Sequence, residues 1–205
     1  MRGWPWRRRQ AGEPMPPLTA RVDPPRWPVW LALAVVVVIK MVAIRDHEIA
    51  AINSGTHCVL SVLARDIPTV SAALDRLGVT WARLPIRFPF HSAAIEPLAE
   101  PMARLTAGFR FADSRWPIVS ASSGGVVSRF DGAHIWQVMR GPLRFRETID
   151  ALAREGEWVL MEAGPSGTLA SFTRQVRAPG VTAWPSIDQF GQNARTMKQL
   201  MAAVA

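Results

Sequence analysis

His91 has the side-chain type and the position that suit proton transfer. It stands in the segment FPFHS at 88–92, directly after an expected strand and before an expected helix, where α/β proteins expose reactive groups. An imidazole titrates near neutrality and can therefore act as a general base. A single histidine among aromatic residues is also often structural, so spacing alone leaves a catalytic and a structural role open for His91.

A serine nucleophile would need the sharp strand-to-helix turn G-x-S-x-G, which exposes the hydroxyl and directs a backbone amide at the developing oxyanion. The sequence holds no such pattern, and in the nearest approach, GPSG at 164–167, Thr168 takes the place of the last glycine. We interpret that segment as a turn, Ser92 as a helix cap, and Glu162 as a capping or packing group. The residue pattern therefore assigns no nucleophile.

Metal and nucleotide sites are not expected. The four histidines lack the H-x-x-x-H and H-E-x-x-H spacings, and a single cysteine cannot build a thiolate site. Walker and Rossmann glycine patterns are absent as well, and SSGG at 122–125, which indicates a turn, has no lysine after it. We therefore predict no metal and no cofactor.

Composition and charge describe a folded domain with a basic start. Of the 205 residues 49% are hydrophobic and 20% charged, which excludes a disordered polymer. The formal charge is +8, and the first 28 residues carry half of it. Because the later arginines lie on different expected elements, we expect no nucleic-acid partner; the alternative, binding through Arg7, Arg8 and Arg9, would be sensitive to salt.

Residues 1–46 differ from the rest of the chain. Residues 1–28 hold seven of the 17 prolines, and residues 29–39 (VWLALAVVVVI) form an unbroken apolar run. Eleven residues are too few to span a bilayer, which needs about 20. A short membrane anchor and a buried strand or helix both remain open for this run, and we expect no membrane partner.

Residues 47–90 are expected to form a small α+β subdomain. Strand-length segments at 47–53 and 57–63 flank a turn at Ser54-Gly55. A helix capped by Asp66 would present its apolar residues at 70, 73, 74 and 77 on one face and end at Gly78. Residues 80–87 (TWARLPIR) are interpreted as an extended segment that adds a further strand.

Residues 91–205 alternate between helical and extended patterns. Ile95, Leu98, Met102 and Leu105 mark an amphipathic helix, and WPIVS at 116–120 a short buried strand. Helices are expected at 131–139 and 144–154, a strand at 157–162, and further helices after Gly167 and Gly191. This alternation predicts an α/β fold.

Several of these segments resemble those of one enzyme family. IAAINSGTHCVLS with Asn53, FPFHS, RGPLRF at 140–145, EAGP at 162–165 and GTL at 167–169 follow one another in the order seen in malonyl-CoA:acyl-carrier-protein transacylases. The resemblance covers residues 47 to about 203. The stretch SIDQFGQNARTMKQLM at 186–201 is similar to the discrete acyltransferases that serve polyketide synthases without a built-in one.

The resemblance implies an α/β-hydrolase-like acyltransferase fold. In this interpretation residues 47–90 are the small ferredoxin-like subdomain, residues 91–205 are the C-terminal part of the large subdomain, and residues 1–46 are unlike the family. The implied reaction is a ping-pong transfer of malonyl from malonyl-CoA, the substrate, to the phosphopantetheine thiol of an acyl carrier protein, in polyketide or fatty-acid biosynthesis.

Four site residues follow from the resemblance. His91 matches the general base, whose ring would be oriented by a backbone carbonyl near Arg144. Asn53 matches a residue of the acyl pocket. Phe90 resembles the malonyl-selective form of the pocket, because its ring would fill the space of an additional methyl group.

The departures from the family are equally specific. The sequence lacks the Gln-containing oxyanion loop, the G-H-S-x-G elbow and the arginine that pairs with the malonyl carboxylate. We therefore expect a C-terminal portion of a cytoplasmic acyltransferase that is inactive alone or is completed by an N-terminal half. The alternative is a non-catalytic remnant that binds a carrier protein or, through residues 29–44, a membrane.

Overall fold

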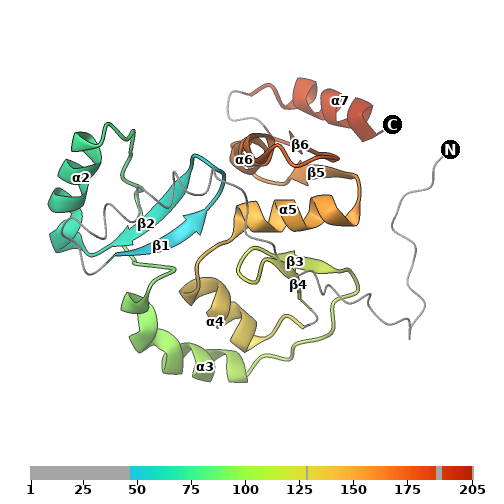
Figure 1. Ribbon diagram of the computed structural model, residues 1–205. Coiled ribbons are helices and arrows are strands. Elements are labelled where there is room, and N and C mark those ends of the chain that lie inside the picture. Colours follow the sequence, from blue (N-terminus) through green and yellow to red (C-terminus); the bar gives the residue numbers. More distant parts are fainter. Residues whose placement is uncertain (1–46, 128, 188–190, 205) are drawn as a thin grey trace.

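The computed structural model describes residues 47–127, 129–187 and 191–204. The expectations for residues 1–46, the apolar run at 29–39 included, lie outside these residues. Helices and strands are interspersed along the described chain (Figure 1), in agreement with the predicted α/β class. The strands form three separate pairs, β1–β2, β3–β4 and β5–β6.

The first pair is the hairpin predicted around Ser54-Gly55. Strand β1 (His47–Ile52) runs antiparallel to β2 (Cys58–Val62), and helix α2 (Ile67–Arg76) packs on it through the buried Val70. The helix ends as predicted, because Gly78 takes a left-handed φ of 65° and the amide of Val79 donates to the carbonyl of Leu74 over 3.0 Å.

The start of α2 differs from its prediction. Asp66 takes the N-cap position, but its side chain caps no amide. The reason is the short 3-10 helix η1 (Ala64–Asp66), which already gives Asp66 a helical backbone, whereas a capping side chain needs the extended conformation.

The extended segment predicted at 80–87 forms no strand, and that prediction was wrong. Pro85 and Pro89 have no amide hydrogen for a sheet ladder, and residues 80–88 are all exposed. The side chain of Trp81 attaches the start of this segment to α2, because its Nε1 donates to Asp75 Oδ1 over 2.7 Å. The segment then continues through Phe90 to His91.

Two helical segments follow His91, η2 (Ala93–Leu98) and α3 (Ala99–Ala107). The predicted apolar face is only partly buried, since Ile95 is buried while Leu98 and Leu105 are 46% and 61% exposed. Because η2 is a 3-10 helix with three residues per turn, it rotates the later residues away from the expected face. Helix α3 packs on α4 (Gly132–Arg140), where Thr106 lies against Gly132.

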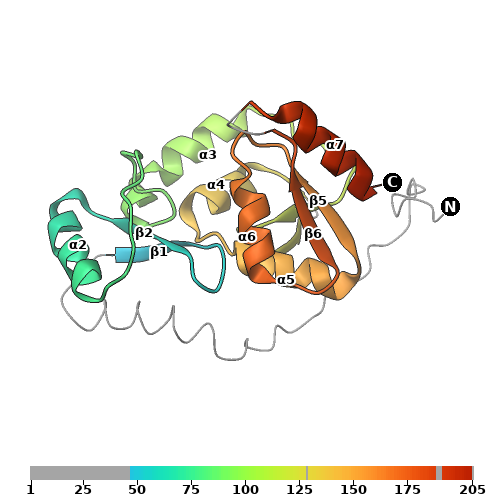
Figure 2. The same cartoon turned by 90° about the horizontal axis from the view of Figure 1, so that it is seen from above.

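The remaining elements form a hairpin and a parallel β-α-β unit. Strands β3 (Ile118–Ser120) and β4 (Gly125–Val127) flank the predicted turn, and β4 itself was not predicted. Helix α5 (Phe145–Glu155) precedes β5 (Trp158–Glu162), α6 (Thr168–Val176), the unpredicted β6 (Val181–Pro185) and α7 (Asn193–Val204). Figure 2 shows α5, α6 and α7 around the parallel pair, and Ile149, Ala170 and Ala183 are buried there.

Candidate active site

The backbone at His91 is held in a conformation that few residues adopt. His91 has a φ of 61°, in the left-handed region that side chains other than glycine rarely enter. Its amide donates to the carbonyl of Met139 over 2.8 Å. Strain of this kind persists only where the surrounding structure imposes it, and it is common at functional sites.

The imidazole of His91 is oriented by a second carbonyl of the same segment. Its Nδ1 lies 2.9 Å from the carbonyl oxygen of Gly141. Because a carbonyl oxygen can only accept, the bonded Nδ1 must carry the hydrogen, which leaves the lone pair of the neutral ring on Nε2. The half-buried ring is therefore arranged to accept a proton at Nε2.

The orienting carbonyl is that of Gly141, and its expected position near Arg144 needs correction. The carbonyl of Arg144 accepts from the amide and the hydroxyl of Thr148, over 2.9 and 2.8 Å. Arg144 precedes α5, so its carbonyl is used by the first turn of that helix. No local sequence signal marks Gly141 for this role, because it contributes only a main-chain carbonyl.

Asn53 and His91 lie beside the same short segment. Ile52 donates its amide to the carbonyl of Leu143 over 2.9 Å, and Leu143 donates to Ala50 over 2.9 Å. Asn53 directly follows Ile52, and its Nδ2 donates to Nδ1 of His57 over 3.1 Å. The structure thus connects Asn53 to His91 through residues 141–143 and not through a bond between the two side chains.

Phe90 borders the imidazole. Its ring centroid lies 6.5 Å from that of His91 and 6.1 Å from that of Phe88. Phe90 is 36% exposed. An apolar ring beside the base can limit the size of a bound acyl group.

Ser92, Ser166 and Cys58 carry the hydroxyl or thiol group that a nucleophile needs. Ser92 is buried and donates to the carbonyl of Pro89 over 2.7 Å, so its hydroxyl does not make the expected helix cap. Ser166 pairs with Thr168 Oγ1 at 2.7 Å. Burial raises the pKa of the Cys58 thiol and so lowers its thiolate fraction. None of these contacts brings a nucleophile to His91.

Glu162 has the capping role that its place at a strand end predicts. Its Oε2 accepts from the amide of Ala170 over 2.8 Å, in the first turn of α6. A carboxylate at this position satisfies a free amide and interacts favourably with the helix dipole. Glu162 therefore orients the end of β5 against α6.

Metal-ligand clusters and membrane-spanning helices are both missing from the described residues. No three His, Cys, Asp or Glu side chains in that part of the chain gather to hold a metal ion. None of its helices has the length and apolar character required to cross a bilayer.

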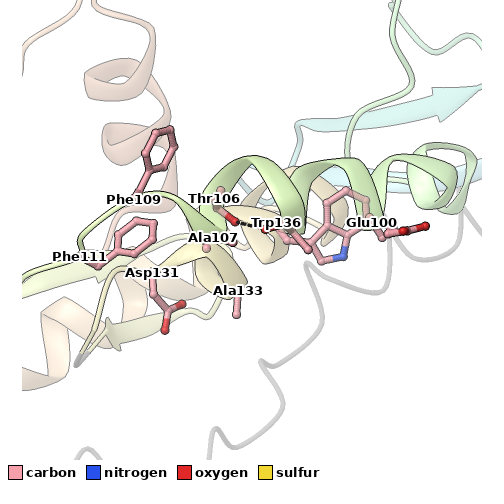
Figure 3. A pocket seen from close by; sticks show the side chains of 11 residues that line it. Glu100, Thr106, Ala107, Phe109, Phe111, Asp131, Ala133 and Trp136 are labelled. Carbon is pink, nitrogen blue, oxygen red and sulfur yellow. Dashed lines mark hydrogen bonds between the residues drawn. The ribbon is translucent and has the colours of Figure 1, made fainter.

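A shallow hollow lies between α3 and α4 (Figure 3). Its volume is about 690 Å³, and Phe109, Phe111 and Trp136 line it together with several alanines. His91 is not one of its lining residues. The hollow therefore gives no support to the site at His91.

Known proteins of polyketide biosynthesis are similar to this chain in sequence. It is 32% identical to the polyketide biosynthesis acyltransferase homolog PksD of Bacillus subtilis, over 67% of this chain and 42% of that protein. It is also 32% identical to the polyketide biosynthesis protein ThaF of Burkholderia thailandensis, over 73% of this chain and 13% of that protein. The chain is a homologue of polyketide acyltransferases. No protein-family model matches it.

Solved structures show the fold of this acyltransferase homologue. The acyltransferase domain of the second module of the salinomycin polyketide synthase superposes with a TM-score of 0.70 and 24% identity, over 82% of this chain and 40% of that one. A malonyl-transacylase solved with its type II carrier protein superposes with a TM-score of 0.68 and 20% identity, over 83% and 55%. The homologue therefore spans about half or less of the proteins that it matches.

Proposed function

We propose that this acyltransferase homologue takes part in the transfer of a malonyl group from malonyl-CoA to the phosphopantetheine thiol of an acyl carrier protein. The observation that carries the proposal is the geometry of His91, whose Nδ1 is bound to the carbonyl of Gly141 at 2.9 Å. This bond directs the basic Nε2 away from the segment that holds the ring. No metal or further cofactor is required, because both substrates are thioesters or thiols.

The proposed reaction has two steps of the same kind. A serine hydroxyl attacks the thioester carbonyl of malonyl-CoA while Nε2 of His91 takes its proton, and the coenzyme A thiolate leaves and receives that proton. In the second step the thiol of the carrier protein gives its proton to Nε2 and attacks the malonyl ester. The serine oxygen leaves and recovers the proton, so that the protein is regenerated.

The serine of this proposal comes from a complementing N-terminal acyltransferase half. The sequence holds no G-x-S-x-G elbow, Ser92 beside His91 is bonded to the carbonyl of Pro89, and Ser166 after β5 is bonded to Thr168. Transfer would take place in the cytoplasm, where malonyl-CoA and holo carrier proteins are available.

Malonyl selection is proposed to rest on Phe90, with Asn53 at the other side of the acyl group. The ring of Phe90 stands 6.5 Å from the imidazole of His91. An added methyl group on the acyl chain would meet this ring, and discrimination of this type is worth about 1 to 3 kcal/mol.

The test measures the intact mass of a holo carrier protein after incubation with malonyl-CoA and this chain. The incubation is repeated with an added N-terminal acyltransferase half that carries a G-H-S-x-G elbow. We expect the malonyl mass increase only when both parts are present, at a rate above that of the added half alone.

Two variants decide the role of the histidine. His91→Ala should reduce transfer to the level of the added half alone. His134→Gln is the matched control. His134 is buried and its Nε2 is bound to Ser120 Oγ at 3.1 Å, so it takes no part in the proposed reaction and the variant should retain transfer. A complex that transfers malonyl equally well with His91→Ala would refute the proposed base, and carrier binding without any transfer would indicate a non-catalytic binding module.

A further inference from the structure

Arg140 connects two carboxylates beside the histidine. Its Nε donates to Glu96 Oε2 over 2.6 Å, and its Nη1 donates to Glu48 Oε2 over 3.4 Å. Glu96 belongs to η2, which follows His91, and Glu48 belongs to β1. One guanidinium therefore joins the end of α4 to two elements that are distant from it in sequence, and the bonds to the two carboxylates raise its pKa.

Arg140 also lies between the two carbonyls that hold His91. The carbonyl of Met139 accepts from the His91 amide over 2.8 Å, and that of Gly141 lies 2.9 Å from Nδ1. A shift of Arg140 would move both carbonyls, because they belong to the residues on either side of it. The position of the imidazole thus depends on a backbone segment that the Arg140 side chain fixes.

Glu48 binds both the backbone that follows His91 and the Arg140 side chain. Its Oε1 accepts from the amide of Ala93, two residues after His91, while its Oε2 faces Arg140. The two oxygens of one carboxylate thereby set the distance between residues 91–93 and the end of α4. Charge-assisted bonds of this kind are stronger than neutral ones.

The partial burial of the arginine distinguishes this cluster from a fully exposed ion pair. The Arg140 side chain is 29% exposed, while the side chains of Glu48 and Glu96 are 42% and 59% exposed. In the pair Arg104–Glu100 on α3, the two side chains are 65% and 79% exposed, and such pairs contribute little to stability. Arg104 is therefore a matched control for the loss of one arginine and one ion pair.

We infer that Arg140 is a positioning residue for His91, which acts with Glu48 and Glu96 by fixing residues 139–141 against residues 91–93. Arg140 does not touch the reacting atoms. It keeps the carbonyl of Gly141 in place for Nδ1 and so keeps the lone pair on Nε2. The kinetic consequence of this inference rests on the proposed function, whereas its structural consequence does not.

The test reads the tautomer of His91 by nitrogen-15 NMR of the full chain labelled at histidine, at a pH above the usual imidazole pKa. In the unaltered chain we expect the Nδ1–H form of His91. In Arg140→Met the ratio of the Nδ1–H to the Nε2–H form should fall about fivefold, as expected when one hydrogen bond is weakened. Arg104→Met should leave the ratio unchanged, and equal ratios in the two variants would overturn the inference.

A second variant covers the case in which Arg140→Met does not fold. Glu48→Gln keeps the size of the side chain and an oxygen for the Ala93 amide, and it removes only the charge that faces Arg140. We expect a smaller fall in the same ratio. A ratio identical to that of the unaltered chain would overturn the inference independently of the first variant.

The kinetic readout separates this inference from the proposed function. With a complementing half present, Arg140→Met should lower kcat about tenfold and leave KM for malonyl-CoA nearly unchanged, because a displaced base affects the chemical step. If His91→Ala retains transfer, the proposed function fails while the tautomer result still stands. If the tautomer is unaffected and His91→Ala abolishes transfer, only the present inference fails.

Discussion

His91 and His134 occupy opposite kinds of surroundings in one domain. His134 is 7% exposed, its Nε2 is bound to Ser120 Oγ at 3.1 Å, and its ring centroid lies 5.0 Å from that of Phe130. His91 is half-buried and has a left-handed backbone, and its Nδ1 is hydrogen-bonded to the main-chain carbonyl of Gly141.

The difference shows how a fold separates a structural histidine from a reactive one. At position 134 the Nε2 atom is used by the protein, and the ring fills space beside the β3–β4 hairpin. At position 91 it is Nδ1 that is hydrogen-bonded, to the carbonyl of Gly141. The left-handed backbone of this residue is unfavourable by about 1 to 3 kcal/mol. The two histidines should therefore differ both in their effect on malonyl transfer and in their effect on the free energy of unfolding.

Gly141→Ala should have the largest effect on the reactive side. A Cβ atom at this position would lie 2.9 Å from the backbone carbonyl of Gln137, so the segment must shift and take the orienting carbonyl with it. We expect malonyl transfer with a complementing half to fall about 100-fold, as for a misplaced catalytic group. Gly108→Ala is the control, because nothing lies within 4 Å of its added Cβ, and equal transfer by both variants would contradict the role of Gly141.

His134→Ala should have the largest effect on the structural side. The change removes a buried ring and its bond to Ser120, and we expect the free energy of unfolding to fall by about 2 kcal/mol. His91→Gly should change the same quantity by less than about 1 kcal/mol, since glycine relieves the left-handed strain while the ring contact is lost. Urea denaturation of the two variants measures both values, and a larger loss for His91→Gly would reverse the contrast.

Phe90→Ser tests the selectivity proposed for the ring beside the base. Removing the ring opens space for a methyl branch, so the ratio of kcat/KM for malonyl-CoA to that for methylmalonyl-CoA should fall about tenfold. Competition between the two thioesters, read by the mass of the carrier protein, gives this ratio directly. Phe109→Ser, at the hollow between α3 and α4, serves as the control that should keep the original ratio.

Ser120→Ala should have the smallest effect of the four. Ser120 Oγ is bonded to His134 Nε2 at 3.1 Å and to Ser122 Oγ at 2.9 Å. Its loss should lower the free energy of unfolding by about 1 kcal/mol and leave transfer unchanged. If Ser120→Ala changed malonyl transfer but not the free energy of unfolding, His134 and Ser120 would have a functional role and not a structural one.

Sequence patterns predicted the elements that have strong local signals. The helix at Ile67–Arg76, its end at Gly78 and the turn after β3 were all expected, because periodicity, a left-handed glycine and a glycine-rich turn are local features. The short strands β4 and β6 were missed. Each depends on a partner strand, and three to five residues carry too little pattern of their own.

The site was predictable only in part for the same reason. His91 and Phe90 stand next to each other in a recognisable segment, whereas the groups that hold the histidine come from remote positions. Gly141 offers only a carbonyl, which every residue has, and Arg140 and Glu48 are 92 residues apart. Such pairings arise from tertiary packing, so composition and spacing do not reveal them.

The parallel pair β5–β6 has a consequence for how the molecule opens. Among the described residues each of these strands has one hydrogen-bonded neighbour, and Val159 and Met161 are 46% and 59% exposed on β5. Amides on unpaired edges are reached by solvent through small local openings. Hydrogen exchange should therefore be fast along the outer edge of β5, and a second polypeptide that supplies a strand there would slow it.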